Sequence, residues 1–230
     1  MPHVGNDIVD LTQSTAKKKS RNIRFLNRVF TPDEQDFILS SSAAFPELRL
    51  WSCWAAKEAA YKAISKACPD IPAIPKLFPV SIDPEGHEDS GTEDPKFQGL
   101  FFPRVSAGSV LTPAGKCCIR IEYRHTYLHC LAFTHAPDTL SVFHHVHYLS
   151  SSFQGEAATD TEAVRLAARF HLAGLLSEHF EDLEIVRQQK GSSAAPPRVF
   201  CRGRLLDVDI SLSHDGFFLA HACLLHPSAP

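Results

Sequence analysis

Three separate segments of the chain carry side chains that could together act on a phosphate group. Asp7 lies in a short strand-like segment, Glu58 and Lys62 lie one helical turn apart in an alanine-rich segment, and Ser213 precedes His214 near the C-terminus. Two carboxylates can hold Mg²⁺, which prefers oxygen ligands and bridges to substrate phosphates. A lysine could neutralise charge on phosphoryl oxygens, and a hydroxyl beside an imidazole could donate hydrogen bonds to a phosphate. Together these residues predict displacement at phosphorus.

Each of these segments also has a simpler interpretation. Glu58 and Lys62 could form an i,i+4 ion pair on a solvated helix face. The run Ser213-His214-Asp215 suggests a hydrolase, but adjacent strand residues point to opposite faces and cannot line up as nucleophile, base and orienting acid. The sequence also has neither a nucleophile elbow nor a Walker loop. A hydrolase that uses Ser213 is therefore disfavoured.

The bulk composition narrows the partners and the compartment. The net charge is −3, so nucleic acid is not an obvious partner, and no apolar run is long enough to span a bilayer. The 7 cysteines include no CxxC pair, which predicts free thiols in a reducing cytoplasm. His145 and His147 would share one strand face, but the sequence shows no third ligand beside them. An ordinary strand is therefore favoured over a metal site.

A strand and a helix must position the carboxylates and the lysine. Residues 5–11 predict a strand, on which period two places Asp7 on the opposite face from its neighbours. Residues 51–66 are rich in alanine and free of Gly and Pro, so they predict a helix. Glu58 and Lys62 fall near one edge of that helix.

A basic segment near the N-terminus could serve as a docking surface. Residues 15–29 predict a helix on which Arg21, Arg24 and Arg28 recur at i, i+3 and i+7. These three side chains would form one cationic stripe. The stripe is either a solvated face or a dock for an acidic partner.

The remaining patterns predict an α+β fold of two similar lobes. Capping boxes at residues 31–34 and 159–162 each begin a helix, and Asp215-Gly216 predicts a turn between two strands. Each half of the chain runs from helix to strands to a closing hairpin, which is a weak internal repeat. The acidic residues 83–95 predict a mobile hairpin tip, and residues 150–155 predict a linker. Further strands are predicted at residues 118–123, 128–133, 140–149, 184–186 and 208–222.

Four short motifs in this order resemble the 4′-phosphopantetheinyl transferase superfamily. They are Gly5-Asn6-Asp7-Ile8-Val9-Asp10-Leu11, Phe30-Thr31-Pro32-Asp33-Glu34, Trp54-Ala55-Ala56-Lys57-Glu58-Ala59 with Lys62, and Ile210-Ser211-Leu212-Ser213-His214-Asp215. The resemblance covers most of the chain outside residues 83–116. It implies a pseudo-dimer of two α+β lobes, with a metal-binding lobe at residues 1–148 and a coenzyme A-binding lobe at residues 149–230.

The chain departs from the family pattern in three places. The long, surfactin-synthetase-activating type has the Ser-His lobe first, so the lobe order here is permuted. Val9 stands where the long type has a third carboxylate, and the first strand instead resembles the short, holo-acyl-carrier-protein-synthase type, in which water completes the metal shell. The family's Gly-Lys-Pro is absent before the Ser-His strand, which leaves Lys190 and Arg198 as candidate contacts to coenzyme A.

The resemblance implies a transfer reaction with defined partners. Coenzyme A would donate 4′-phosphopantetheine to a serine of an apo acyl or peptidyl carrier protein, and 3′,5′-ADP would leave. Asp7 and Glu58 would hold Mg²⁺, while Glu58 takes the serine proton and Lys62 stabilises phosphoryl charge. Ser213, His214 and Arg165 would bind coenzyme A, and the arginine stripe would dock the acidic carrier protein.

Two alternatives remain open at the level of sequence. The first is a non-catalytic module that binds coenzyme A or a carrier protein, against which the retained Asp7, Glu58 and Lys62 argue. The second concerns assembly, because short members of the family build their site across subunits and long members build it between lobes of one chain. The presence of both lobes predicts a monomer with one site per chain, and a site swapped between chains is the rival.

Overall fold

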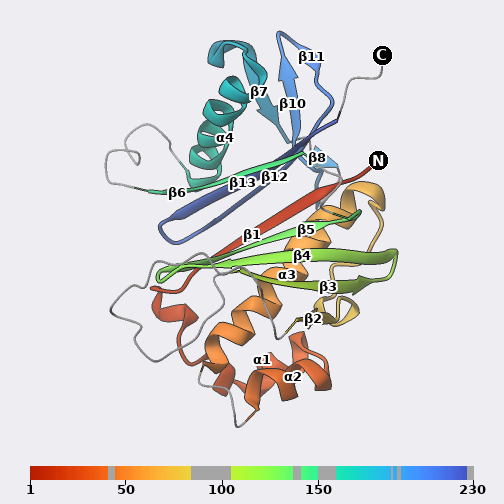
Figure 1. Ribbon diagram of the computed structural model, residues 1–230, viewed down its shortest axis with the longest axis vertical. Coiled ribbons are helices and arrows are strands. Elements are labelled where there is room, and N and C mark those ends of the chain that lie inside the picture. The colour runs from red at the N-terminus through yellow and green to blue at the C-terminus, as the bar shows by residue number, and fades with distance from the viewer. Residues whose placement is uncertain are drawn as a thin grey trace.

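The protein is built around two main antiparallel sheets, each covered by one long helix (Figure 1). The computed structural model describes residues 1–40, 45–83, 105–136, 141–149, 159–187, 189–190 and 193–226. The expected α+β class is confirmed, and the arrangement is compatible with two similar lobes. The predicted linker at residues 150–155, and all but the first residue of the predicted acidic tip at 83–95, lie outside the described residues.

The first sheet has five strands in the order β1-β5-β4-β3-β2, and every neighbouring pair is antiparallel. The predicted hairpin of residues 118–133 is confirmed as β4 and β5, and β3 lies where the sequence predicted no strand. The strands are β1 (Val4–Asp10), β2 (Val80–Ile82), β3 (Val105–Thr112), β4 (Gly115–Tyr123) and β5 (Tyr127–Phe133).

Helix α3 (Pro46–Ala67) lies against the first sheet and starts five residues earlier than the sequence predicted. Its alanines form the contact, and Ala59 and Ala63 are fully buried. A Cβ on Gly5 would lie 1.9 Å from the carbonyl oxygen of Ala59, so only glycine lets β1 and α3 approach this closely. This close packing sets the distance between the side chains of β1 and those of α3.

The segment before α3 differs from the single basic helix that the sequence predicted. Two 3₁₀ turns, η1 (Ser14–Ala16) and η2 (Lys19–Arg21), flank Lys18, which has a left-handed φ of 59°. Helix α1 (Ile23–Val29) begins only after Asn22, whose side chain accepts a hydrogen bond from the Phe25 N–H. The Asn22 cap fixes where α1 starts, because it satisfies one of the free N–H groups of the first turn.

Helix α2 (Pro32–Leu39) begins at the predicted capping box of Thr31 and Glu34, which is confirmed. Beyond α3, the 3₁₀ turn η3 (Pro75–Leu77) leads into β2.

The second sheet has the order β12-β13-β6 and packs on helix α4 (Asp160–Leu176). Strands β12 (Val208–Asp215) and β13 (Phe218–Leu225) flank the predicted turn, in which Gly216 has a φ of 52°. Strand β6 (Val142–Tyr148) pairs with β13. The sequence division at residue 148 put this strand in the first lobe, so the change of sheet comes earlier in the chain than expected, and the two-domain division remains a proposal.

Small elements complete the region after α4. A 3₁₀ turn η6 (Phe180–Asp182) leads into a three-stranded sheet in the order β11-β10-β7, and two short strands, β8 and β9, form a separate pair. The strands are β7 (Leu183–Val186), β8 (Gln189–Lys190), β9 (Ser193–Ala194), β10 (Arg198–Cys201) and β11 (Arg204–Leu205).

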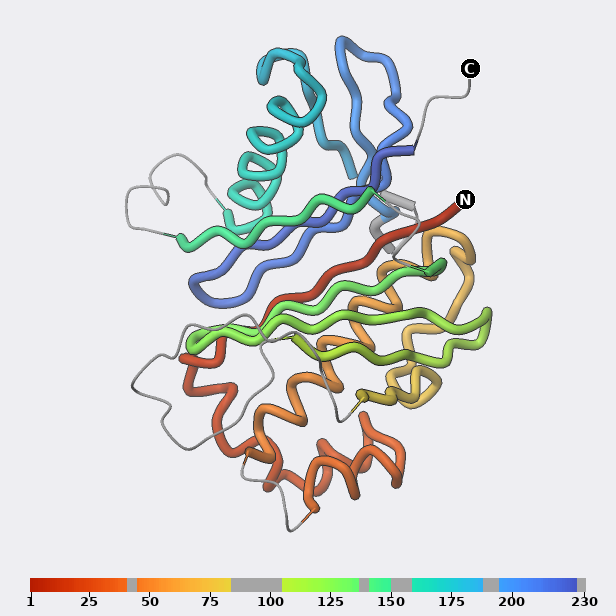
Figure 2. The backbone as a smooth tube through the Cα atoms, in the orientation of Figure 1, coloured from red at the N-terminus to blue at the C-terminus, as the bar shows by residue number. Residues whose placement is uncertain are grey.

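The two sheets meet where β1 runs beside β12 (Figure 2). Three N–H groups of β1 donate to side chains of β12: Val4 to Asp209 at 2.7 Å, Asn6 to Ser211 at 2.9 Å and Asp10 to Asp215 at 2.8 Å. Alternate N–H groups of a strand point to the same edge, so those not used by β5 are available to β12. The polar side chains of β12 thereby satisfy the free edge of the first sheet and join the two sheets.

All 7 cysteines are free, as the sequence predicted. Within the described ranges, the structure has no helix that is both long and apolar enough to cross a membrane.

Candidate functional site

Lys62 joins helix α3 to strand β1 at the predicted site. Its Nζ lies 2.7 Å from Asp7 Oδ1, and it also donates a hydrogen bond to the carbonyl oxygen of Asn6 at 3.0 Å. The simpler interpretation, an ion pair between Glu58 and Lys62, is not what the structure shows. Lys62 instead reaches the carboxylate on the neighbouring strand, because Gly5 brings the helix and the strand together.

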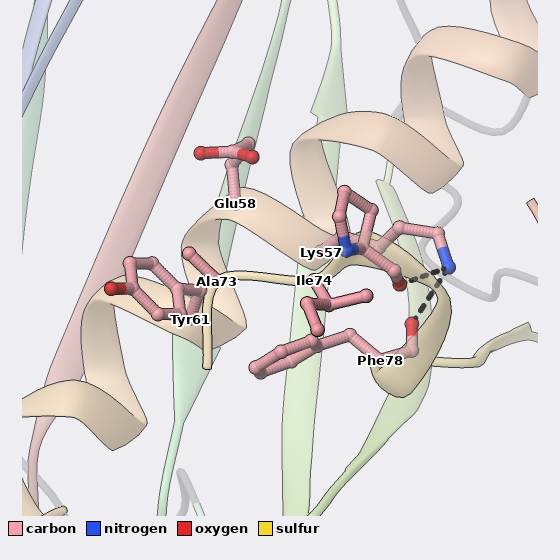
Figure 3. Close-up of a pocket in the computed structure, with 7 residues that line it drawn as sticks. Lys57, Glu58, Tyr61, Ala73, Ile74 and Phe78 are labelled. Carbon is pink, nitrogen blue, oxygen red and sulfur yellow. Dashed lines mark hydrogen bonds between the residues drawn. The ribbon is translucent and has the colours of Figure 1, made fainter. Parts of the chain in front are cut away.

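Glu58 lies one turn before Lys62 and has no hydrogen bond or ion pair to any described residue. Its carboxylate points away from Ile74 and Phe78 in Figure 3. Burial raises the pKa of Glu58, and the negative charge of Asp7 raises it further, against the opposing effect of Lys62. Glu58 is therefore a carboxylate with free oxygens and an increased affinity for a proton.

The electrostatic surroundings of Asp7 bring in the second sheet. The pKa of Asp7 is raised, chiefly because the carboxyl group is buried. The positive charge of Lys62 opposes this increase. Two residues of the second sheet also contribute, because Asp215 raises the pKa and His214 lowers it. His214 and Asp215 end strand β12, so their charges reach Asp7 across the junction of the sheets. The structure thus brings together Asp7, Glu58 and Lys62, while His214 acts on Asp7 only through its charge.

Ser213 differs from the other polar side chains on this edge of β12 because its hydroxyl has no hydrogen-bond partner among the described residues. Asp209, Ser211 and Asp215 each accept a hydrogen bond from β1, whereas the Ser213 Oγ is buried and has no partner among the described residues. A buried hydroxyl without a partner loses about 1–3 kcal/mol, so a ligand that bonds to it is favoured. The role of Ser213 in binding a phosphate stays a prediction.

His214 is 42% exposed, and its Nδ1 lies 3.9 Å from Asp160 Oδ2 at the start of α4. Asp215 instead accepts from the N–H of Asp10, so Ser213, His214 and Asp215 do not form a hydrolytic triad.

The sequence did not predict Asp215 as a neighbour of Asp7. The signal that could have found it is the alternation of polar residues at 209, 211, 213 and 215, which marks one polar edge of β12. Gly216 lets the Asp10 side chain pack against the turn between β12 and β13, since a Cβ on Gly216 would lie 2.1 Å from Asp10 Oδ2. Asp10 Oδ2 also accepts a hydrogen bond from the Phe217 N–H at 3.0 Å.

Of the three basic residues predicted to contact coenzyme A, only Arg165 lies on an element that approaches the site. Arg165 is half-buried on α4, the helix whose first residue Asp160 approaches His214. Arg198 is exposed at the start of β10, and no described interaction joins it to Asp7. Lys190 lies in β8, and its side chain is outside the described part of the structure.

The three candidate docking arginines are all exposed, but they do not share one helix. Arg24 and Arg28 lie four residues apart on α1, and Arg21 ends the preceding 3₁₀ turn. The predicted i, i+3, i+7 stripe on a continuous helix is therefore wrong, because Asn22 starts a new helix after Arg21.

Lys57 and Val9, which belong to the motifs, have structural roles. Lys57 Nζ lies 2.7 Å from Glu34 Oε1, both side chains are 2% exposed, and Lys57 also donates to the carbonyl oxygens of Pro75 and Phe78. These bonds fix η3 beside a small pocket next to α3 (Figure 3). Val9 is buried under α3, so the position of the third carboxylate belongs to the core.

Comparison with known proteins finds relatives of the first part of the chain. Residues 3–100 match the family model described as the 4′-phosphopantetheinyl transferase superfamily. A holo-[acyl-carrier-protein] synthase of Protochlamydia amoebophila is 44% identical over 61 residues, which are 26% of this chain and 48% of the relative. The enzymes of the same name from Chlamydia caviae and Chlamydia felis are 36% and 33% identical over 62 and 64 residues, or 27% and 28% of this chain and 49% and 51% of theirs. The chain thus spans about half the length of the curated relatives it matches.

Proposed function

We propose, from the kinship of residues 3–100 with the 4′-phosphopantetheinyl transferase superfamily, that this chain transfers 4′-phosphopantetheine from coenzyme A to an apo acyl or peptidyl carrier protein. The observation that supports this most directly is the convergence of Asp7, Glu58 and Lys62 where β1 packs against α3. The released product is 3′,5′-ADP.

Glu58 and Lys62 have different roles in the proposed reaction. The carrier serine oxygen forms a bond to the phosphorus next to pantetheine, and the bond from that phosphorus to the ADP oxygen breaks. Glu58 accepts the serine proton, directly or through a water, because its carboxylate is unpaired and its pKa is raised. Lys62 places positive charge beside the phosphoryl oxygens while its bond to Asp7 fixes its position.

The donors on β12 bind the substrate phosphate. The unpartnered hydroxyl of Ser213 lies on the side of β12 that faces β1, whereas the exposed ring of His214 lies on the opposite side, near Asp160 of α4. Each of them would donate to a different phosphate oxygen of coenzyme A. Arg165 is proposed for the nucleotide end of coenzyme A, and Lys190 and Arg198 stay proposals for the same ligand.

The carboxylates fit a hard divalent cation such as Mg²⁺. The described residues bond Asp7 only at Oδ1 and leave Glu58 free, and the mutual repulsion of the two carboxylates is the pattern expected at a cation site. When bound, Mg²⁺ would neutralise negative charge on the diphosphate. Asp7 and Glu58 would be its protein ligands.

The alternative is a module that binds coenzyme A or a carrier protein without transfer. One assay separates the two: the full chain is incubated with coenzyme A, Mg²⁺ and a panel of apo carrier proteins, and carrier masses are measured. A phosphopantetheine mass gain on at least one carrier is expected. Binding of coenzyme A with no mass gain on any carrier would favour the non-catalytic module.

A further inference from the structure

A second cluster of metal-ligating side chains lies at the junction of the sheets, on the other face of β1 from Asp7. Glu122 of β4, His129 of β5 and His144 of β6 each offer one ligand atom, and these atoms lie within 4.8 Å of one another. Glu122 and His129 are direct partners in the first sheet, while His144 comes from the second. His144 Nε2 lies 3.2 Å from Glu122 Oε1.

His129 is fully buried and has an unused ring nitrogen. Its Nε2 lies 3.3 Å from Asn6 Nδ2, and its Nδ1 has no hydrogen-bond partner among the described residues. Asn6 Oδ1 is also buried without a partner. If the Asn6 amide is turned over, Oδ1 accepts the Nε2–H of His129 and the Nδ1 lone pair is left for a ligand, which is the arrangement common in metal-bound histidines.

We propose that Glu122, His129 and His144 hold a divalent transition-metal ion of the Zn²⁺ class, which links the two sheets. Two imidazoles and one carboxylate form a ligand set that zinc accepts, with water in the fourth position. Bonds of about 2.0–2.1 Å in a tetrahedron place ligand atoms about 3.3 Å apart, close to the distance between His144 and Glu122. The other ligand-atom distances are within 4.8 Å, so the third ligand atom must move closer for the metal to bind.

This site goes beyond the proposed transfer reaction and differs from it in chemistry. Asp7 and Glu58 offer only oxygen ligands, whereas this cluster offers two nitrogens, which Mg²⁺ does not favour. The two sites lie on opposite faces of β1, since Asn6 and Asp7 are consecutive strand residues. Arg120 lies 3.5 Å from Glu122 Oε1 and is 47% exposed, so the competing state is a metal-free network of Arg120, Glu122 and His144.

A binding experiment on the full chain tests the proposal with a matched control. The chain is stripped with a chelator, then titrated with Zn²⁺ against a chromophoric chelator in excess Mg²⁺. Wild type should bind one equivalent, and His144→Gln should lose affinity by at least about tenfold. His145→Gln removes the adjacent, exposed histidine from the opposite face of β6 and should bind as wild type does.

A second group of histidines could bind Zn²⁺ in place of the proposed site. His145, His147, His171 and His221 gather on the α4 side of the second sheet, and His171 Nδ1 lies 2.7 Å from His221 Nε2. If His145→Gln weakens Zn²⁺ binding while His144→Gln does not, the metal belongs to that group and the proposal is wrong. It is also overturned if wild type binds no Zn²⁺, or if His144→Gln and His145→Gln both bind like wild type.

Thermal unfolding gives a second readout that does not depend on transfer activity. Because a ligand that binds only the folded state stabilises it, Zn²⁺ should raise the Tm of wild type and of His145→Gln. Glu122→Gln and His144→Gln should show little or no rise, and circular dichroism checks that both are folded. A failure of transfer leaves this result unchanged, so the two proposals can fail separately.

Discussion

Lys62 and Glu58 lie on the same helix edge, but the structure gives them different partners. Lys62 is bonded to Asp7, whereas no residue that the structure describes bonds to either oxygen of Glu58. A group that accepts a proton needs a free lone pair, and a group that stabilises charge needs a fixed position. At the level of single residues this difference supports Glu58 as the base and Lys62 as the fixed positive charge.

The first prediction concerns these two carboxylates. Glu58→Gln or Asp7→Asn should lower turnover by about two orders of magnitude or more, the scale of a lost transition-state electrostatic contact. The measurement is the rate of carrier mass gain with coenzyme A and Mg²⁺. Asp33→Asn, which removes an exposed carboxylate on α2, is the control and should retain activity. Full activity of Glu58→Gln would contradict the proposed role of Glu58 in the site.

A second prediction concerns Asp209, which holds the start of β12 against β1 and α3. Burial raises its pKa, but the bonds from His3, Lys66 and the Val4 N–H outweigh burial and lower the pKa below 3.8. Its stabilisation is therefore present above the unfolded-state pKa near 3.8 and is lost as pH falls through the lower folded-state pKa.

Asp209→Asn should therefore lower the free energy of unfolding at pH 7 by about 3 kcal/mol, because Lys66 is left buried without its partner. The difference from wild type should shrink as the pH falls below about 4. Urea denaturation across pH measures this, with the exposed Asp207→Asn as the control. A difference that stays constant down to the lowest pH would contradict the ionic role of Asp209.

At the scale of elements, the contact between β1 and α3 sets the geometry of the site. Gly5→Ala should destabilise the protein by about 2 kcal/mol, because the new Cβ would collide with the carbonyl oxygen of Ala59. It should also reduce turnover, since moving β1 from α3 separates Asp7 from Lys62.

Gly174 gives a matched control for that substitution. It lies in α4 with nothing within 4 Å of an added Cβ, so Gly174→Ala should stabilise the protein by about 0.5 kcal/mol. Chemical denaturation and turnover of both variants are measured together. Equal stability changes in the two would show that the β1–α3 contact is not tight.

A further prediction concerns the exposed arginines around α1 and the docking of the carrier protein. Reversing Arg21, Arg24 and Arg28 to Glu should raise the KM for an acidic carrier protein by about tenfold or more, with little change in the KM for coenzyme A. The wild-type carrier KM should rise with salt, since exposed charges are screened beyond about 10 Å at 0.1 M. Arg204→Glu on β11 is the control. Unchanged carrier kinetics would leave these arginines as a solvated surface.

At the scale of the whole molecule, the proposed site takes Asp7, Glu58 and Lys62 from the first sheet and its helix, and His214 from the second sheet. The bonds between β1 and β12 support one site per chain and a protein active as a monomer. The rival is a site shared between two chains after a swap of the second sheet.

Mixing of two inactive variants distinguishes these arrangements. Asp7→Ala and His214→Ala chains are co-expressed so that subunits can exchange, and carrier mass gain is measured. If each site lies within one chain, the mixture stays inactive because every site carries one lesion. Recovery of a fraction of wild-type activity would contradict the monomer.

The sequence by itself determined several of the local elements. Capping at Thr31, alanine content in α3 and the turn at Gly216 depend on interactions within a few residues, so they can be read from the chain. Period two likewise placed Asp7 on the opposite face of β1 from its neighbours. Arg21 shows the limit of this approach, because helical spacing alone did not reveal that Asn22 starts a new helix.

Only the tertiary structure decided which distant residues meet. The pairing of Lys62 with Asp7, the proximity of Asp215, the exchange of β6 into the second sheet and the meeting of His144 with Glu122 and His129 all join residues far apart in sequence. Such contacts depend on how closely two backbones approach and which strand edges are left unpaired. Gly5 and the free N–H edge of β1 set those conditions, and their consequences appear only when the two sheets are packed together.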